Sequence, residues 1–187
     1  MFSRSRSAVS RFDDRVDSLF DQLRGRPAPD RFFYAASELG DFSLVWLLLA
    51  AARGLRSERD EKAAVRLGVC ALGESALVNG VIKSFFRRKR PVLDYIRPHY
   101  LRTPLTSSFP SGHATAAACH AILLSEDDPR WPAYVLIAGV VATSRVYVKI
   151  HHASDVIAGL GLGLGLGLLA RRLWPLPAAP AAPAEQG

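Results

Sequence analysis

The sequence predicts an all-α fold: an integral membrane helical bundle of about five spanning helices, with an amphipathic helix at its N-terminus. Two observations lead to this prediction. The 187-residue chain is 49% hydrophobic, and its apolar residues gather in segments long enough to form membrane helices. Its net charge of +7 indicates nucleic acid, a membrane surface or phosphate chemistry within a membrane. The basic residues do not alternate with aromatic ones and no nucleic-acid docking motif occurs, which disfavours nucleic acid.

Residues 1–31 are predicted to form an N-terminal surface helix. Between residues 8 and 24, apolar side chains recur at helical spacing among Arg and Asp: Val9, Phe12, Val16, Leu19, Phe20 and Leu23. This pattern suits a helix that lies on the membrane surface or on the bundle. The N-terminus lacks the apolar core and the cleavage site that are typical of a secretory signal peptide.

Residues 32–173 are predicted to form the membrane domain. The candidate spans are residues 34–52, 64–82, 111–125, 131–148 and 153–170. At about 1.5 Å of rise per residue, helices of these lengths cross most of a hydrocarbon core of about 30 Å. Arg66, Glu74 and His120 should face the bundle interior, because ionisable groups are costly in lipid. A soluble domain with unusually apolar helices is the alternative.

The last span contains the repeat GLGLGLGLGL at residues 159–168. Alternation would favour a strand, but on a helix Gly159, Gly163 and Gly167 form one face, and small residues at this spacing let membrane helices approach closely. The same helix is a candidate surface for homo-oligomers. The tail at residues 174–187 is rich in Pro and Ala and is predicted to be disordered.

Three polar motifs stand at the ends of the apolar segments. They are KSFFRRKRP at residues 83–91, SSFPSGHATAA at residues 107–117 and SRVYVKIHHASD at residues 144–155. If the spans alternate in direction, all three motifs reach the same side of the membrane. The topology therefore predicts one site built from all three.

The first two motifs have the residues of a phosphate site. Lys83 and Arg90 supply positive charge, whereas Arg87 to Lys89 are interpreted as an exposed, positively charged loop. In the second motif, Ser111 and Gly112 stand at an expected helix start, where free backbone N–H groups favour an anion. His113 could donate a proton to that anion, or it could simply cap or pack the helix.

The third motif supplies a further phosphate ligand, Arg145, and two adjacent histidines. His151 is four residues before Asp155, so a carboxylate on the same helix face could orient its imidazole as a base or nucleophile. His152 is three residues before Asp155, and spacing alone does not exclude it.

Taken together, the motifs resemble the tripartite signature of the type 2 phosphatidic acid phosphatase superfamily. All three parts occur in order without a substitution, and the resemblance covers about residues 34–170. It implies that His151 is the nucleophile, that Asp155 orients it and that His113 is the general acid. It also implies that the phosphoryl oxygens are held by Lys83, Arg90, Ser111, Gly112 and Arg145.

The resemblance implies a lipid phosphate phosphatase in the cell membrane of a bacterium, crossing the membrane several times. The expected substrates are phosphatidic acid, phosphatidylglycerol phosphate, or polyprenyl phosphates or diphosphates. We expect no cofactor and no metal, since a cationic cage replaces one, and no nucleic-acid partner. The alternatives are a vanadium-dependent haloperoxidase and a membrane protein that only binds lipid head groups. The excess of basic residues favours a cytoplasmic site, whereas many bacterial members of this superfamily act on the outer face.

Overall fold

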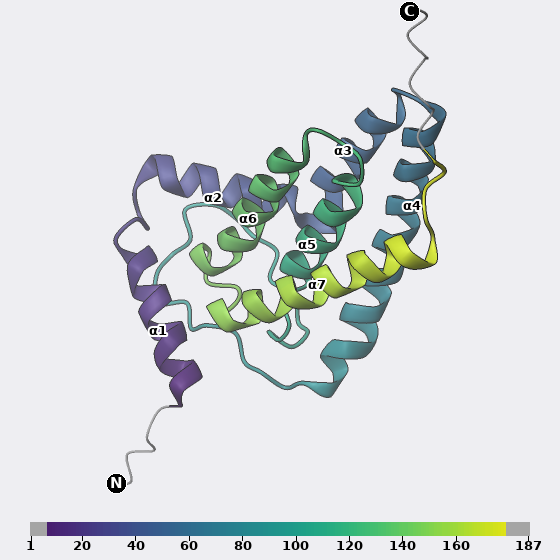
Figure 1. Ribbon diagram of the computed structural model, residues 1–187. Coiled ribbons are helices and arrows are strands. Elements are labelled where there is room, and N and C mark those ends of the chain that lie inside the picture. Colours follow the sequence, from purple (N-terminus) through teal and green to yellow (C-terminus); the bar gives the residue numbers. More distant parts are fainter. Residues whose placement is uncertain (1–6, 179–187) are drawn as a thin grey trace, which may run out of the picture.

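The computed structural model describes residues 7–178, and over that range the chain is helical without a β-strand, which confirms the predicted all-α class (Figure 1). The α-helices are α1 (Ala8–Asp21), α2 (Pro27–Leu39), α3 (Leu44–Gly54), α4 (Glu58–Ser75), α5 (Gly112–Leu124), α6 (Trp131–Tyr147) and α7 (Ala153–Leu173). Short helical segments of other types join or extend some of them. The 3-10 helix η1 (Asp41–Ser43) links α2 to α3, while the π-helix η2 (Ala76–Val81) and the 3-10 helix η3 (Ile82–Phe85) extend α4. Of the predicted disordered tail, residues 174–178 follow α7 without helix, and the rest lies outside the described residues.

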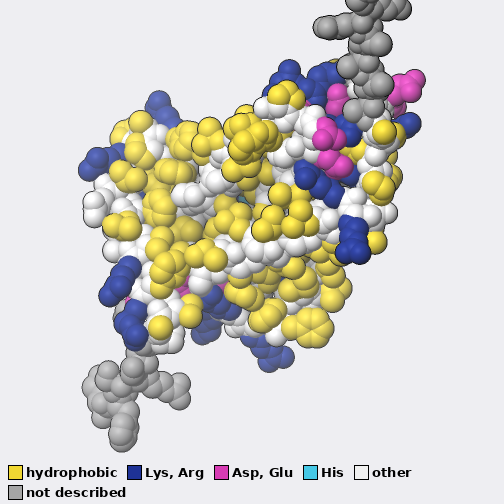
Figure 2. All heavy atoms as spheres, in the orientation of Figure 1, with side chains coloured by type: hydrophobic (Ala, Val, Ile, Leu, Met, Phe, Trp, Pro, Cys, Tyr) yellow, Lys and Arg dark blue, Asp and Glu magenta, His cyan; other side chains and the backbone are white. Residues whose placement is uncertain are grey.

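Two helices in the described part of the chain are long and apolar enough to cross a bilayer: Glu58–Phe85 and Ala153–Leu173. The pair formed by α2 and α3 would count as a third span, while α5 is apolar but shorter. The predicted count of five spans is therefore not confirmed. Figure 2 shows hydrophobic side chains across the broad middle of one face, with Lys and Arg mainly toward its edges, as expected for a protein whose sides contact lipid.

The first predicted span, residues 34–52, is not one straight helix. The chain bends by 67° between α2 and α3. The helix is broken because Phe42 and Ser43 have left-handed backbone angles, with φ of 52° and 58°. The bend directs η1 toward the start of α5.

Helix α1 lies on the bundle through one apolar edge. Val16, Phe20 and Leu23 pack against the ends of α6 and α7, whereas Val9 and Leu19 stay more than half exposed. The predicted helix of residues 1–31 is shorter in the structure: residues 27–31 belong to α2, and residues 1–6 lie outside the described residues. Of the two settings predicted for it, the inner edge of α1 occupies the bundle surface.

Helices α5 and α7 pack so closely that glycine is required between them. A Cβ on Gly163 would lie 2.1 Å from the Thr115 carbonyl oxygen, and one on Gly159 would lie 2.5 Å from the Ser111 carbonyl oxygen. At Gly161 and Gly165 an added Cβ would meet nothing within 4 Å, so these two glycines form the open face of the repeat. The predicted role of the Gly repeat in close helix packing is confirmed, and the packing aligns the N-terminal ends of the two helices.

The opposite end of the bundle is joined by buried arginines. Arg53 donates to the Leu124 and Glu126 carbonyl oxygens at the end of α5, and its Nε donates to Asp60 over 2.6 Å. Arg66, buried within α4, pairs with the Glu126 carboxylate. Because the Glu126 carboxylate offsets its charge, Arg66 is tolerated inside the predicted span of residues 64–82.

Candidate active site

The starts of α5 and α7 bring the second and third motifs together. The Ser111 N–H donates to the Asp155 carbonyl oxygen over 3.0 Å, which joins the two helix starts directly. Ser111 is fully buried, and its side chain accepts a hydrogen bond from the Ala114 N–H as the N-cap of α5. Ser111 therefore shapes the site through its backbone and its cap, while the neighbouring Gly112 faces the cavity described below.

His151 lies in the short connection between α6 and α7 and is 2% exposed. Its Nε2 is 3.4 Å from Nη1 of Arg90, and its Nδ1 is 3.7 Å from Oδ2 of Asp155. Burial lowers the pKa of His151 to about 3, the carboxylate of Asp155 opposes this shift, and the charges of Arg145 and Arg90 add to it. The imidazole is therefore neutral at pH 7 and keeps a lone pair, as a nucleophile requires.

Asp155 is fully buried and accepts hydrogen bonds from several donors. Its Oδ2 accepts from the Ser108 hydroxyl and, over 2.9 Å, from the His152 N–H, while its Oδ1 accepts from Arg88 over 2.6 Å. The bond to the His152 N–H closes a capping box at the start of α7. Asp155 thus holds the histidine-bearing connection as well as standing near His151 itself.

The interpretation of Arg88 as an exposed loop charge is wrong. Its guanidinium bridges Asp155 and Asp13, with 2.6 Å to each carboxylate. Asp13 comes from α1, is 4% exposed, and also accepts from the Ser154 N–H and hydroxyl. A chain of charges therefore runs from the N-terminal helix to the candidate orienting acid.

Helix α1 contacts the same connection at a second point. Asp17 and Asp21 follow Asp13 at four-residue intervals, and Lys149 lies 3.2 Å and 3.8 Å from their carboxylates. Burial disfavours the charged form of Lys149, but hydrogen bonds to Asp94 and Asp17 outweigh it and raise the pKa. The acidic face of α1 thus fixes the segment that carries His151.

Arg145 projects from α6 with 1% exposure. Its Nη1 donates to the Ser37 hydroxyl, while Nε and Nη2 have no hydrogen-bond partner among the described residues. Lys83, on the α4 extension, is 5% exposed. Burying a cation costs free energy unless an anion pairs with it. Arg145 and Lys83 therefore have the properties of an anion-binding site.

Arg90 is held by backbone carbonyls at the edge of the site. It donates to Ile150 over 3.0 Å, to Thr106 over 3.1 Å and to Pro104 over 3.1 Å. These bonds hold the guanidinium of Arg90 beside His151 and tie it to the loop that contains Pro104 and Thr106. His152 caps α7, and its Nε2 is 3.3 Å from the Lys89 carbonyl oxygen.

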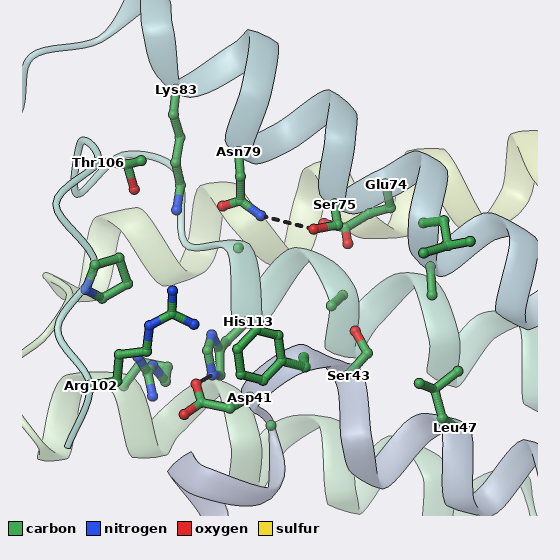
Figure 3. Close-up of a pocket in the computed structure, with 18 of the residues that line it drawn as sticks. Asp41, Ser43, Leu47, Glu74, Ser75, Asn79, Lys83, Arg102, Thr106 and His113 are labelled. Carbon is green, nitrogen blue, oxygen red and sulfur yellow. Dashed lines mark hydrogen bonds and ion pairs between the residues drawn. The ribbon is translucent and has the colours of Figure 1, made fainter. Parts of the chain in front are cut away.

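One cavity of about 840 Å³ is lined by five of the eight predicted site residues, whereas Arg90, Ser111 and Asp155 are not in its lining. Its lining includes Lys83, Gly112, His113, Arg145 and His151. Figure 3 shows Lys83, Asn79, Ser75 and Glu74 succeeding one another along one helical wall, with His113, Asp41 and Arg102 on the other side. The cavity continues between α3 and α4, where its walls are largely apolar: Leu47, Val65, Val69 and Leu72.

His113, at the first turn of α5, contacts a residue that sequence reasoning missed. Its Nε2 lies 2.9 Å from Oδ1 of Asp41 in η1. Ser108, Arg88 and Asn79 were missed as well. Asn79 is against the second motif, because a Cβ on Gly112 would lie 3.2 Å from its side-chain oxygen. For Arg88 the sequence held one signal: it is two residues before Arg90, so both arginines could extend to the same side of an extended loop.

Comparison with known proteins agrees with this geometry. Residues 63–176 match the model of the PAP2 superfamily. The decaprenylphosphoryl-5-phosphoribose phosphatase of Mycolicibacterium smegmatis is 36% identical over 138 residues, which cover 73% of this chain and 74% of that protein. An undecaprenyl-diphosphatase of Sulfolobus acidocaldarius is 34% identical over 88 residues, covering 45% of this chain and 43% of that protein.

A solved structure supports the same assignment over most of the chain. The transmembrane PAP2-type phosphatidylglycerolphosphate phosphatase from Bacillus subtilis covers 90% of this chain and 87% of its own, with a TM-score of 0.65 and 25% identity. The motifs gathered around one cavity, the family match and these relatives identify the chain as a member of the PAP2 superfamily and a hydrolase of phosphoric esters.

Proposed function

We propose that this protein hydrolyses the phosphomonoester or diphosphate of a membrane lipid through a phosphohistidine intermediate on His151. The observation that carries the proposal is the two-part cavity. One end holds cations and histidines, and the other runs between apolar walls of α3 and α4. A phosphate head group with a hydrocarbon tail is the ligand that matches both ends.

In the proposed reaction, Lys83, Arg90 and Arg145 hold the phosphoryl oxygens and offset the charge that develops on them. The neutral imidazole of His151 attacks phosphorus, and Asp155 stabilises the positive charge that forms on the ring. His113 gives a proton to the leaving lipid oxygen. Water then attacks the phosphohistidine, and His113 takes a proton from that water.

The names of the relatives favour a lipid that carries a terminal phosphate group. They describe a decaprenylphosphoryl-5-phosphoribose phosphatase, an undecaprenyl-diphosphatase and a phosphatidylglycerolphosphate phosphatase. Their common chemistry is a terminal phosphate on a lipid. We extend that class to this chain, with polyprenyl phosphates and diphosphates and phosphatidylglycerol phosphate as the first substrates to assay.

The test is phosphate release from a panel of lipid phosphates and diphosphates by the purified protein in detergent. The wild-type protein should release phosphate in the presence of EDTA and should be inhibited by vanadate, which mimics the pentacoordinate transition state. His151→Ala should abolish both turnover and phosphoenzyme. Activity that requires an added metal would contradict the mechanism, and halide oxidation with vanadate, without phosphate release, would instead favour a haloperoxidase.

The proposed setting is a cell membrane that the chain crosses several times, with α1 at its surface. Because Gly159, Gly163 and Gly167 already pack against α5, a homo-oligomer through the Gly-rich helix would use the open face of Gly161 and Gly165. Crosslinking of a Gly161→Cys variant in the membrane tests this contact. A monomeric product would count against it.

A further inference from the structure

The break between α2 and α3 brings a carboxylate to His113. Asp41 and His113 are in contact at 2.9 Å, as the dashed line in Figure 3 marks. Both side chains line the cavity and are partly exposed to it, at 28% for Asp41 and 16% for His113. An imidazole beside a carboxylate has one ring nitrogen fixed and its protonated form stabilised.

The backbone around Asp41 is costly and closely fitted to the histidine. Phe42 and Ser43 both adopt the left-handed region without being glycine, a conformation that is unfavourable for residues with a side chain. The preceding residue is Gly40, where a Cβ would lie 2.8 Å from Cδ2 of His113. The segment 40–43 is therefore strained at Phe42 and Ser43, and it has a glycine, Gly40, where a side chain would collide with His113.

A purely structural role for Asp41 is the simpler alternative. As the first residue of η1, it could act as a capping group for the chain that follows. However, its carboxylate accepts no hydrogen bond from that backbone in the described residues, and its contact is with the imidazole. The contact thus points across the cavity to the proposed acid rather than along its own helix.

We propose that Asp41 is a positioning residue for His113. Its carboxylate fixes Nε2 and stabilises the imidazolium, which leaves Nδ1 to exchange protons with the reacting phosphate. This inference rests on the proposed function, since it assigns a task to the general acid of that reaction. Asp41 lies before residues 63–176, the part of the chain that matches the family model, so the family match does not assign it.

Protons balance over the two steps of the reaction. As the bond from the His151 nitrogen to phosphorus forms, the bond from phosphorus to the lipid oxygen breaks, and the proton on Nδ1 of His113 goes to that oxygen. In the second step a water proton returns to Nδ1 while the water oxygen bonds to phosphorus and the bond to His151 breaks. Asp41 stays ionised throughout and changes only the stability of the charged ring.

The test compares two leaving groups in Asp41→Asn. Dodecyl phosphate releases a poor leaving group that needs a proton, whereas a nitrophenyl phosphate with an alkyl chain of the same length releases a good one that does not. General acid catalysis typically contributes about 10²–10⁴-fold. We therefore expect kcat/KM for dodecyl phosphate to fall by about 10–100-fold and kcat/KM for the nitrophenyl ester to change by less than about threefold.

A second readout follows the other step. If His113 is a poorer base without Asp41, hydrolysis of the phosphohistidine slows, and the nitrophenyl ester should give a burst of nitrophenolate equal to the enzyme concentration. Glu38→Gln is the matched control, because it removes the same charge from an exposed position on α2. It should leave both kcat/KM values unchanged and produce no burst.

The outcomes separate the two proposals. An equal loss for both esters would mean that Asp41 serves binding or folding, and no loss for either would mean that it is dispensable; either result overturns the inference. The lipid-phosphatase proposal is tested separately by comparing dodecyl phosphate with propyl phosphate in the wild-type protein. Equal kcat/KM values for dodecyl and propyl phosphate would contradict a lipid substrate. The comparison of the two leaving groups would still be valid in that case.

Discussion

The close contact between α5 and α7 predicts opposite effects for two glycines that are two residues apart. Gly163→Ala introduces a methyl group 2.1 Å from the Thr115 carbonyl oxygen and 3.0 Å from the Ala118 Cβ. Backbone atoms cannot turn aside, so the helices must separate by about 1 Å. Gly161→Ala makes the same chemical change at a position with nothing within 4 Å.

The expected free-energy difference follows from two effects. Alanine is favoured over glycine in a helix by about 1 kcal/mol, and this gain applies to both variants. Overpacking at a tight contact costs about 1–3 kcal/mol, and it applies to Gly163→Ala alone. Gly161→Ala should therefore be slightly more stable than the wild type. Gly163→Ala should lie below Gly161→Ala by about 1–3 kcal/mol, or roughly 3–10 °C in unfolding temperature for a chain of this size.

Thermal unfolding in detergent, with phosphate release measured on the same samples, tests this reasoning. Separating α5 from α7 also moves His113 relative to His151, and a 1 Å misplacement can cost about 100-fold in rate. Gly163→Ala should thus lose activity even below its unfolding temperature. If both variants matched in stability and rate, the helices would not be in the contact described here.

Three further results are expected. Asp13→Asn weakens the ion pair that holds Arg88 on Asp155. Steady-state kinetics should therefore show kcat lower by about tenfold with little change in KM, because a small displacement of reacting groups slows the chemical step. A change in KM with kcat unaltered would contradict this role. Because burial keeps the pKa of His151 near 3 in the folded protein against about 6.5 unfolded, stability should decline as pH falls from about 6.5 toward 3, and His151→Gln should reduce that decline in melting experiments. His152→Ala should keep substantial activity because His152 points to the loop carbonyl of Lys89, and loss equal to that of His151→Ala would show the assignment of the nucleophile to be wrong.

The residues that meet at the charged end of the cavity could be predicted because each belongs to a short motif at a helix end. Lys83, His113, Arg145 and His151 meet in one cavity as the alternating topology predicted. The packing face of the Gly repeat was also predictable, since helical spacing alone separates Gly163 from Gly161. These inferences needed local periodicity and the direction of the helices, and the choice of His151 over His152 also needed the family resemblance.

What could not be predicted depends on the path of the backbone. The bend at Phe42 and Ser43 has no glycine or proline at the left-handed positions, so an apolar run reads as a straight span and Asp41 is overlooked. Among neighbouring basic residues, only the course of the loop decides that Arg88 turns inward. Spacing suggested a direct bond between His151 and Asp155, but their 3.7 Å separation reflects the competing cap at the start of α7.

The contact between Asp13 and Ser154 has a consequence for biosynthesis. The two residues are 141 positions apart in the chain, so α1 leaves the ribosome well before α7 and has to wait for it before this contact can form. Contacts of such long range form late, because the closure of the intervening loop opposes them. The connection that carries His151 therefore becomes rigid only after α7 has been made, so the proposed nucleophile is not yet organised in a partly made chain.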